Sequence, residues 1–231
     1  MIELIAFDAD DTLWHTEYLY QAARQQFRDL LRPYVDLDIL EVHVHETEMR
    51  NLPYYGFGIT SFILSLIETA VEVTDGRVTG AEIGRLLELS REMVSADVEL
   101  IYEVEETLAA LSADYPLLLI TKGDLLHQTG KVARSGLGRY FAGIEVVADK
   151  TPETYRDILA RRNVAPERFV MVGNSPRSDI LPVATLGGRA IYVPDANTWV
   201  YDLVDVPDGL PGVVYRAGRV WEVVDLVRGL R

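Results

Sequence analysis

Short, mostly apolar runs recur along the chain, and each is stopped by a polar residue or a turn. They cover residues 4–7, 117–120, 144–147, 169–172 and 190–193, and a shorter run lies at 213–215. A strand that is buried on both faces of a parallel sheet has this continuous apolar pattern. The pattern therefore predicts five buried strands and a sixth strand at the edge of the sheet.

Segments with helical periodicity separate most of these runs. Apolar side chains fall on one helical face in residues 104–111, 155–159 and 180–186, and a last helix is expected at 220–228. Alternation of strands and helices is typical of a parallel sheet whose crossover helices cover both faces. The predicted fold class is α/β, with a Rossmann-like parallel sheet.

One long stretch breaks this alternation. Between residues 15 and 98 no strand is evident, and four helical patterns follow one another instead. They cover residues 16–31, 37–50, 58–73 and 79–96. The segment 52–56, Leu-Pro-Tyr-Tyr-Gly, is expected to break the chain between the second and third helices. We predict an all-helical cap domain at 15–98, inserted into a Rossmann-like domain formed by 1–14 and 99–231.

Composition and charge exclude several classes of protein. The 231 residues hold 36 Asp and Glu against 22 Lys and Arg, which gives a formal net charge of −14. This acidity argues against nucleic acid and against anionic membranes as partners. The chain has no cysteine, so disulfides, thiolate zinc sites and cysteine nucleophiles are excluded. No basic, apolar leader precedes Asp8, and polar residues interrupt the apolar segment 57–73. We therefore expect a cytoplasmic protein.

Polar side chains follow the predicted strands at their carboxyl ends, where open parallel sheets bind ligands. These side chains are Asp8, Asp10, Thr121, Lys122, Lys150, Asn174 and Asp179. Carboxylates two positions apart in extended chain lean to one side, so Asp8 and Asp10 would repel each other. A divalent cation or a shared proton would offset that repulsion.

Each of these features also has a purely structural explanation. Asp8 and Asp10 could form an acidic turn, Thr121 could cap the following helix, and Lys150 could be a solvated turn residue. The spacing alone does not decide between the two interpretations.

The combination of motifs, in this order, resembles the haloacid dehalogenase-like superfamily of phosphohydrolases. That family has Asp-x-Asp-x-Thr after the first strand and Ser or Thr after the second core strand. A Lys ahead of a helix follows, and then Gly-Asp or a variant with a later Asp. The matching positions here are 8–12, Thr121, Lys150 and 173–179. The helical insert lies where this family has its helical cap.

The resemblance implies a catalytic role for most of these side chains. Asp8 would attack phosphorus and become an aspartyl phosphate. Asp10 would protonate the leaving oxygen and then take a proton from the hydrolytic water. Thr121 and Lys150 would bind the phosphoryl group, and Lys122 is a further candidate for contact with substrate.

The resemblance also implies Mg²⁺ as the cofactor. Its ligands would be Asp8, the backbone carbonyl of Asp10, Asp179 and Asn174. Two residues depart from the common pattern of the family. Asp11 stands where many members have Gly, and Asn174 stands where many have Asp. An amide oxygen brings no charge, so metal binding would depend more on Asp179.

The predicted function is hydrolysis of a small phosphorylated metabolite by a Mg²⁺-dependent phosphatase, as a monomer or homodimer. A phosphotransferase or phosphomutase that passes the phosphoryl group to another hydroxyl is one alternative. A haloacid dehalogenase with the same nucleophile is disfavoured, because it has no need of a leaving-group acid or a metal. A degenerate phosphate-binding regulatory module finds support in Asn174 alone.

Overall fold

The computed structural model describes residues 1–230, which divide into two compact units. The first contains Met1–Glu17, Val98–Lys122 and the described residues from Gln128 onward. The second contains Tyr18–Asp97 together with the short segment Gly123–His127, which the predicted helical insert did not include. Each unit has its own apolar core.

A parallel sheet of six strands forms the centre of the first unit, in the order β3-β2-β1-β4-β5-β6. The strands are β1 (Leu4–Phe7), β2 (Leu117–Lys122), β3 (Gly143–Val147), β4 (Phe169–Gly173), β5 (Arg189–Tyr192) and β6 (Val213–Arg216). The predicted α/β Rossmann-like fold and its six strands are confirmed. Strand order reverses next to β1, so the carboxyl ends of β1 and β4 meet where such sheets bind ligands.

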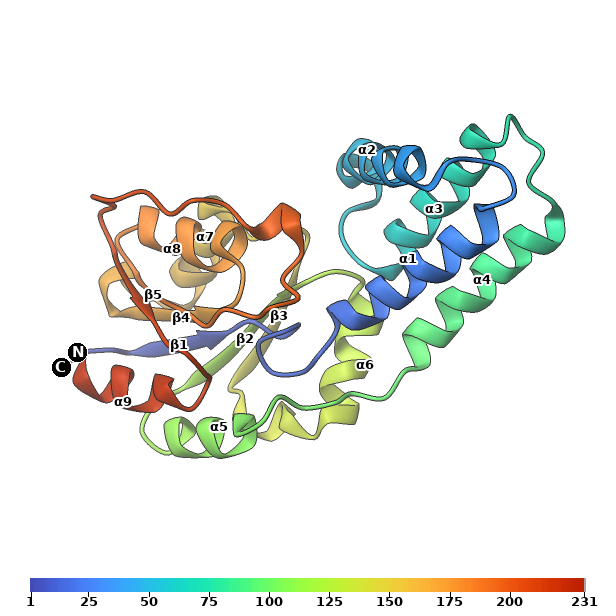
Figure 1. Cartoon of the computed structure of the whole chain (residues 1–231). Helices are drawn as coiled ribbons and strands as arrows, with labels where there is room; N and C mark the ends of the chain where they lie inside the picture. The colour runs from blue at the N-terminus through green and yellow to red at the C-terminus, as the bar shows by residue number, and fades with distance from the viewer. Residues whose placement is uncertain (231) are drawn as a thin grey trace. The chain divides into compact units, whose positions relative to one another are not determined.

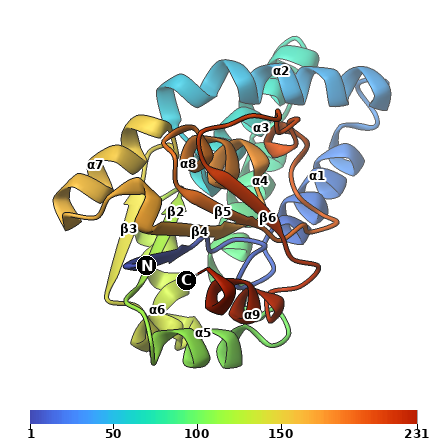
Figure 2. The ribbon, with the colours of Figure 1, turned by 90° about the vertical axis from the view of Figure 1, so that its left-hand side faces the viewer.

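Helices cover both faces of this sheet (Figures 1 and 2). On one face lie α5 (Val104–Ser112), α6 (Leu125–Ser135) and α9 (Glu222–Gly229); on the other lie α7 (Pro152–Arg162) and α8 (Leu181–Thr185). Strand side chains alternate between the two layers. Ile5 and Phe7 pack with the first group of helices, and Leu4 and Ala6 with the second. Burial on both faces explains why the strands read as unbroken apolar runs.

A wide turn precedes α8. The predicted helix at 180–186 begins at Leu181, because Pro176–Ile180 form one turn of π-helix directly after β4 and Asn174–Ser175. Single π turns often occur at functional sites. Here the turn carries Asp179, one of the predicted site residues.

Four helices make up the body of the second unit, at the four places where the periodicity predicted them. They are α1 (Glu17–Leu31), α2 (Leu37–Tyr55), α3 (Ile59–Val73) and α4 (Gly80–Ser95). Their inward faces form one core that includes Phe27, Leu40, Leu66 and Leu86. Neither these helices nor any other helix within residues 1–230 is long and apolar enough to cross a membrane.

The predicted break at 52–56 is wrong for most of its length. Helix α2 continues through Pro53 to Tyr55 and ends at Gly56, whose φ of 70° is left-handed. A proline in the last turn removes one backbone donor, and the helix still closes through the Gly56 N–H, which donates to the Leu52 carbonyl at 2.9 Å. The glycine, not the proline, ends the helix.

Candidate active site

The ends of β1 and β4 place Asp8 and Asp179 in the same part of the first unit. The Asp8 N–H donates to the carbonyl of Val172 in β4 at 2.8 Å, so the residue after β1 is still fixed by the sheet. Asp179 packs directly over Gly173, the last residue of β4, where any Cβ would overlap its carboxylate. Glycine at position 173 is therefore what lets the Asp179 side chain lie against the strand end.

Lys150 joins these two carboxylates. Its Nζ donates to Asp8 Oδ1 and, at 2.7 Å, to Asp179 Oδ1. The Lys150 side chain is 1% exposed and that of Asp179 is fully buried. Burial alone would lower the pKa of Lys150, but the two carboxylates raise it above the ordinary value. The alternative that Lys150 is a solvated turn residue is therefore wrong.

Negative charge exceeds positive charge at this point. Burial raises the pKa of Asp179, and the nearby Asp8 adds to the rise, while Lys150 and the Ser175 N–H oppose it. The Ser175 N–H donates to Asp179 Oδ2 at 3.0 Å. One ammonium is thus shared by two buried carboxylates, and a further cation would favour the ionised form of Asp179.

The donors in this place have the chemistry that Mg²⁺ prefers. Asp8 and Asp179 provide carboxylate oxygens, and the nearby Asn174 provides an amide oxygen. No group of three or more Asp, Glu, His or Cys side chains within residues 1–230 is arranged to hold a metal. Mg²⁺ commonly uses one or two carboxylates and completes its shell with water and substrate phosphate. The residues present therefore fit Mg²⁺, because they offer two carboxylates and a neutral oxygen donor.

Thr12 connects Asp8 with Asn174. The Thr12 hydroxyl lies 3.2 Å from Asp8 Oδ2 and 3.2 Å from Asn174 Oδ1. The Asn174 amide is fixed on its other side, where Nδ2 donates to the Thr198 hydroxyl at 3.1 Å. The amide oxygen therefore faces the Asp8 side, and the role of Asn174 in metal binding stays a prediction.

Asp10 has a separate set of partners. Its Oδ1 accepts from Trp14 Nε1 at 2.8 Å, from Thr16 Oγ1 at 2.7 Å and from Lys131 Nζ. Its Oδ2 accepts from Gln128 Nε2 at 2.8 Å. Burial would raise the pKa of Asp10, but the Lys131 charge and these hydrogen bonds hold it well below the ordinary value. Asp10 is thus kept ionised by donors that Asp8 does not use.

The last two residues of β2 lie at the same edge of the sheet. The buried Thr121 hydroxyl is 3.4 Å from the Lys122 carbonyl oxygen. The Lys122 ammonium donates to Ser178 Oγ at 2.9 Å and to Asp202 Oδ1 at 3.2 Å. Ser178 precedes Asp179 in the π turn, so Lys122 braces that turn. Binding of a phosphoryl group by Thr121 and of substrate by Lys122 stays a prediction.

Asp11 has a structural reason to differ from glycine. Its φ of 57° is left-handed, a conformation that glycine adopts freely and Asp tolerates better than most residues. Its Oδ1 accepts from the Thr16 N–H at 2.8 Å and its Oδ2 from the Glu17 N–H at 3.1 Å, where α1 begins. Burial raises the pKa of Asp11 to about 7, and the charge of Asp10 adds to the rise. Asp11 thus gives α1 a cap that glycine would lack.

Sequence reasoning missed the donors around Asp10. Gln128 and Lys131 are three residues apart on α6, so they share one face of the helix. Both are buried, with 3% and 5% of their surface exposed. Two polar residues at helical spacing, in the helix that follows the strand ending in Lys122, were the available signal.

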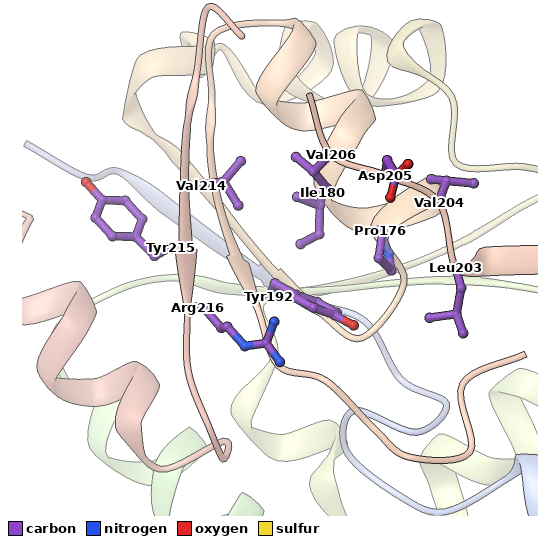
Figure 3. Close-up of a pocket in the computed structure, with 10 residues that line it drawn as sticks. All are labelled: Pro176, Ile180, Tyr192, Leu203, Val204, Asp205, Val206, Val214, Tyr215 and Arg216. Atoms are coloured by element: carbon purple, nitrogen blue, oxygen red, sulfur yellow. The ribbon is translucent and has the colours of Figure 1, made fainter. Parts of the chain in front are cut away.

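A pocket of about 700 Å³ lies beside the first and last residues of the π turn. Pro176 and Ile180 line it together with Leu203–Val206, the end of β5 and strand β6 (Figure 3). The Arg216 guanidinium at its rim lies over the Tyr192 ring, 5.3 Å from the centroid. The pocket is mostly apolar, and none of the predicted site residues lines it.

Comparison with known proteins gives consistent matches. A family model for haloacid dehalogenase-like hydrolases matches residues 2–187. A solved haloacid dehalogenase-like family hydrolase from Xanthomonas campestris is 41% identical, with a TM-score of 0.89, over 99% of this chain and 91% of the other. A glyceraldehyde 3-phosphate phosphatase of Pyrococcus furiosus is 27% identical over 203 residues, 83% of this chain and 80% of the relative. A 2-haloacid dehalogenase structure from Pseudomonas syringae pv. tomato DC3000 is 25% identical, with a TM-score of 0.66 and complete coverage of both chains.

Proposed function

The chain belongs to the haloacid dehalogenase-like hydrolases, and on that basis we propose that it is a Mg²⁺-dependent phosphatase of a small phosphorylated metabolite. The observation that carries the proposal is the placement of Asp10, two residues after the candidate nucleophile, where its carboxylate accepts hydrogen bonds from four side chains. A halide leaves without a proton, whereas the oxygen that leaves a phosphomonoester needs one. A fixed second carboxylate therefore supports phosphate chemistry. The phosphatase from Pyrococcus furiosus adds to that support.

The proposed reaction has two displacements at phosphorus. A carboxylate oxygen of Asp8 attacks, the bond from phosphorus to the ester oxygen breaks, and Asp10 gives that oxygen a proton. Water then attacks the aspartyl phosphate and gives a proton to Asp10, which restores Asp8 and releases phosphate. Lys150 offsets the negative charge that the phosphoryl group brings beside Asp8.

The donors around Asp10 favour its ionised form, which is the form that accepts a proton from water. The approach of a doubly negative phosphoryl group raises the pKa of a neighbouring carboxyl, and this favours the protonated form needed in the first displacement. Mg²⁺, held by Asp8, Asp179, the Asp10 carbonyl and Asn174, would supply positive charge to the phosphoryl oxygens.

A substrate screen tests the proposal. The purified protein, with Mg²⁺, should release phosphate from p-nitrophenyl phosphate and from members of a panel of sugar phosphates, triose phosphates, nucleotides and phospho-acids. Glyceraldehyde 3-phosphate belongs in the panel because of the curated relative. Asp8→Asn should abolish the release, and equal activity in that variant would disprove the mechanism. Recovery of phosphorylated product in place of inorganic phosphate would indicate a transferase or mutase.

Dehalogenation by Asp8 is the second candidate function, favoured by the 25% identical dehalogenase structure. Chloride release from 2-chloropropionate in the presence of a chelator would support it. The phosphatase proposal expects no chloride under those conditions.

Size-exclusion chromatography with light scattering would distinguish the monomer from the homodimer, both of which the proposal accommodates.

A further inference from the structure

The two carboxylate oxygens of Asp10 have unequal surroundings. Oδ1 accepts hydrogen bonds from Trp14, Thr16 and Lys131. These three donors outnumber the two lone pairs of a carboxylate oxygen. Oδ2 accepts from Gln128, its one donor among the described residues. A lone pair therefore remains on Oδ2 and none remains on Oδ1. Of the two oxygens, Oδ2 is the one that can exchange a proton with a bound molecule.

Gln128 holds this free oxygen in place. Its Nε2 donates one hydrogen to Asp10 Oδ2 at 2.8 Å and lies 2.6 Å from the Lys122 carbonyl oxygen, which takes the other. Both neighbours are pure acceptors, so the amide nitrogen must face them and the amide cannot be flipped. Lys122 ends β2, and the Gln128 amide thereby ties Asp10 to a rigid strand.

The remaining atom of this amide is unusual. Gln128 Oε1 is buried and accepts no hydrogen bond from any residue in the part of the chain that the structure describes. A buried acceptor left unpaired is destabilising, so it points to a donor from outside the chain. The hydrolytic water and a substrate hydroxyl are such donors, and both act beside the proton-exchanging oxygen of Asp10.

We propose that Gln128 is the positioning residue that makes Oδ2 the acid and base oxygen of Asp10. The inference rests on the proposed phosphatase function. Without the amide, the carboxylate keeps its three donors on Oδ1 and loses the one contact that fixes where Oδ2 points. Proton transfer to the leaving oxygen then loses its geometry, while the attack by Asp8 does not.

Two substrates that differ in their need for a proton separate these steps. Nitrophenolate leaves well without a proton, whereas the alkoxide of glycerol phosphate does not. For Gln128→Met, which has a similar length and no amide, kcat/KM should fall about 10- to 100-fold for glycerol phosphate, at or below the lower end of the 10²–10⁴ range that acid catalysis contributes. For p-nitrophenyl phosphate it should fall less than about 3-fold. Asp10→Asn should show the same split with a larger ratio.

The control is Val132→Ala, which loosens α6 at a buried apolar side chain one turn further along. It should lower kcat/KM for both substrates by the same factor. Equal losses for both substrates in Gln128→Met would overturn the inference while the split in Asp10→Asn still stood. No split in Asp10→Asn, or no hydrolysis of either substrate by the native protein, would instead disprove the proposed function.

Discussion

Replacement of Lys150 by methionine tests whether one ammonium holds the candidate site together. The side chain is 1% exposed and donates to Asp8 and Asp179, whose side chains are 10% and 0% exposed. Methionine keeps the length and apolar stem of lysine but removes the charge. Lys150→Met therefore leaves two buried carboxylates facing each other with no cation between them.

The expected loss of stability follows from these contacts. At the 2.7 Å that separates Lys150 Nζ from Asp179 Oδ1, two unit charges attract by about 6 kcal/mol in a medium of effective dielectric constant near 20. The contact with Asp8 adds a similar amount, and the cost of burying the ammonium offsets a large part of both. Removal of one partner from a buried ion pair typically costs about 3–5 kcal/mol, which we expect here. In a protein of this size that corresponds to a fall in Tm of about 6–20 °C.

Thermal unfolding followed by circular dichroism, in EDTA at pH 7.5, measures this loss. Addition of Asp179→Asn to Lys150→Met should recover part of the stability, because it removes one of the opposed charges. Mg²⁺ should raise the Tm of Lys150→Met more than that of the native protein, since the metal supplies the missing positive charge. The control Arg32→Met removes an exposed ion pair with Asp29 and should leave Tm almost unchanged. A Tm for Lys150→Met within about 2 °C of the native value would refute the reasoning.

Three further predictions concern the surroundings of the site and the second core. Gly173→Ala places a Cβ in the Asp179 carboxylate, so it should lower the free energy of unfolding in urea by about 1–3 kcal/mol and should also lower phosphatase activity. Native stability with full activity would contradict the close contact between Gly173 and Asp179. Asp11→Ala should cost about 1–2 kcal/mol through loss of the α1 cap, whereas Asp11→Asn keeps an acceptor and the left-handed backbone and should cost less; equal losses in thermal melts would argue against capping. Leu66→Ala, at a fully buried position of α3, should lower the free energy of unfolding by about 2–5 kcal/mol. The matched variant Leu64→Ala, at an exposed position of the same helix, should lower it by less than about 1 kcal/mol. Similar urea midpoints for the two variants would show that the second core is not packed as described.

The strands were predictable from sequence because this sheet buries both of its faces. Residues such as Leu118 and Leu119 point to opposite layers, yet both are fully buried, so each strand is a continuous apolar run. The end of such a run also indicates where site residues lie, because all parallel strands present their carboxyl ends at one edge of the sheet. Asp8 and Asp179 come together for this reason, although 170 residues of chain lie between their positions in the sequence.

The partners of Asp10 could not be predicted in the same way. Lys131 and Gln128 reach Asp10 from a helix, and which face of α6 meets β1 depends on packing against the sheet that the sequence does not display. The burial of Lys150 was equally hard to predict from the sequence, since a lysine after a strand is usually solvated. Pro53 misled because a proline is usually expected to break a helix, whereas α2 continues past it and ends at Gly56.

The charge distribution at the site predicts that phosphate binding depends on the metal. Asp8 and Asp179 share the single positive charge of Lys150, and the second buried ammonium, Lys131, is paired with Asp10. A doubly negative phosphate that arrives beside Asp8 therefore meets a site that is already negative, and a divalent cation reverses that sign. With Mg²⁺ and inorganic phosphate at about 100 times its Kd, the native protein should gain about 2.7 kcal/mol, a rise in Tm of about 5–11 °C, and in EDTA the same phosphate should give no rise. Asp179→Asn should lose the metal-dependent rise, while Asp29→Asn, on the exposed surface of α1, should keep it. An equal phosphate-induced rise with and without Mg²⁺ would show that the lysines alone bind the anion.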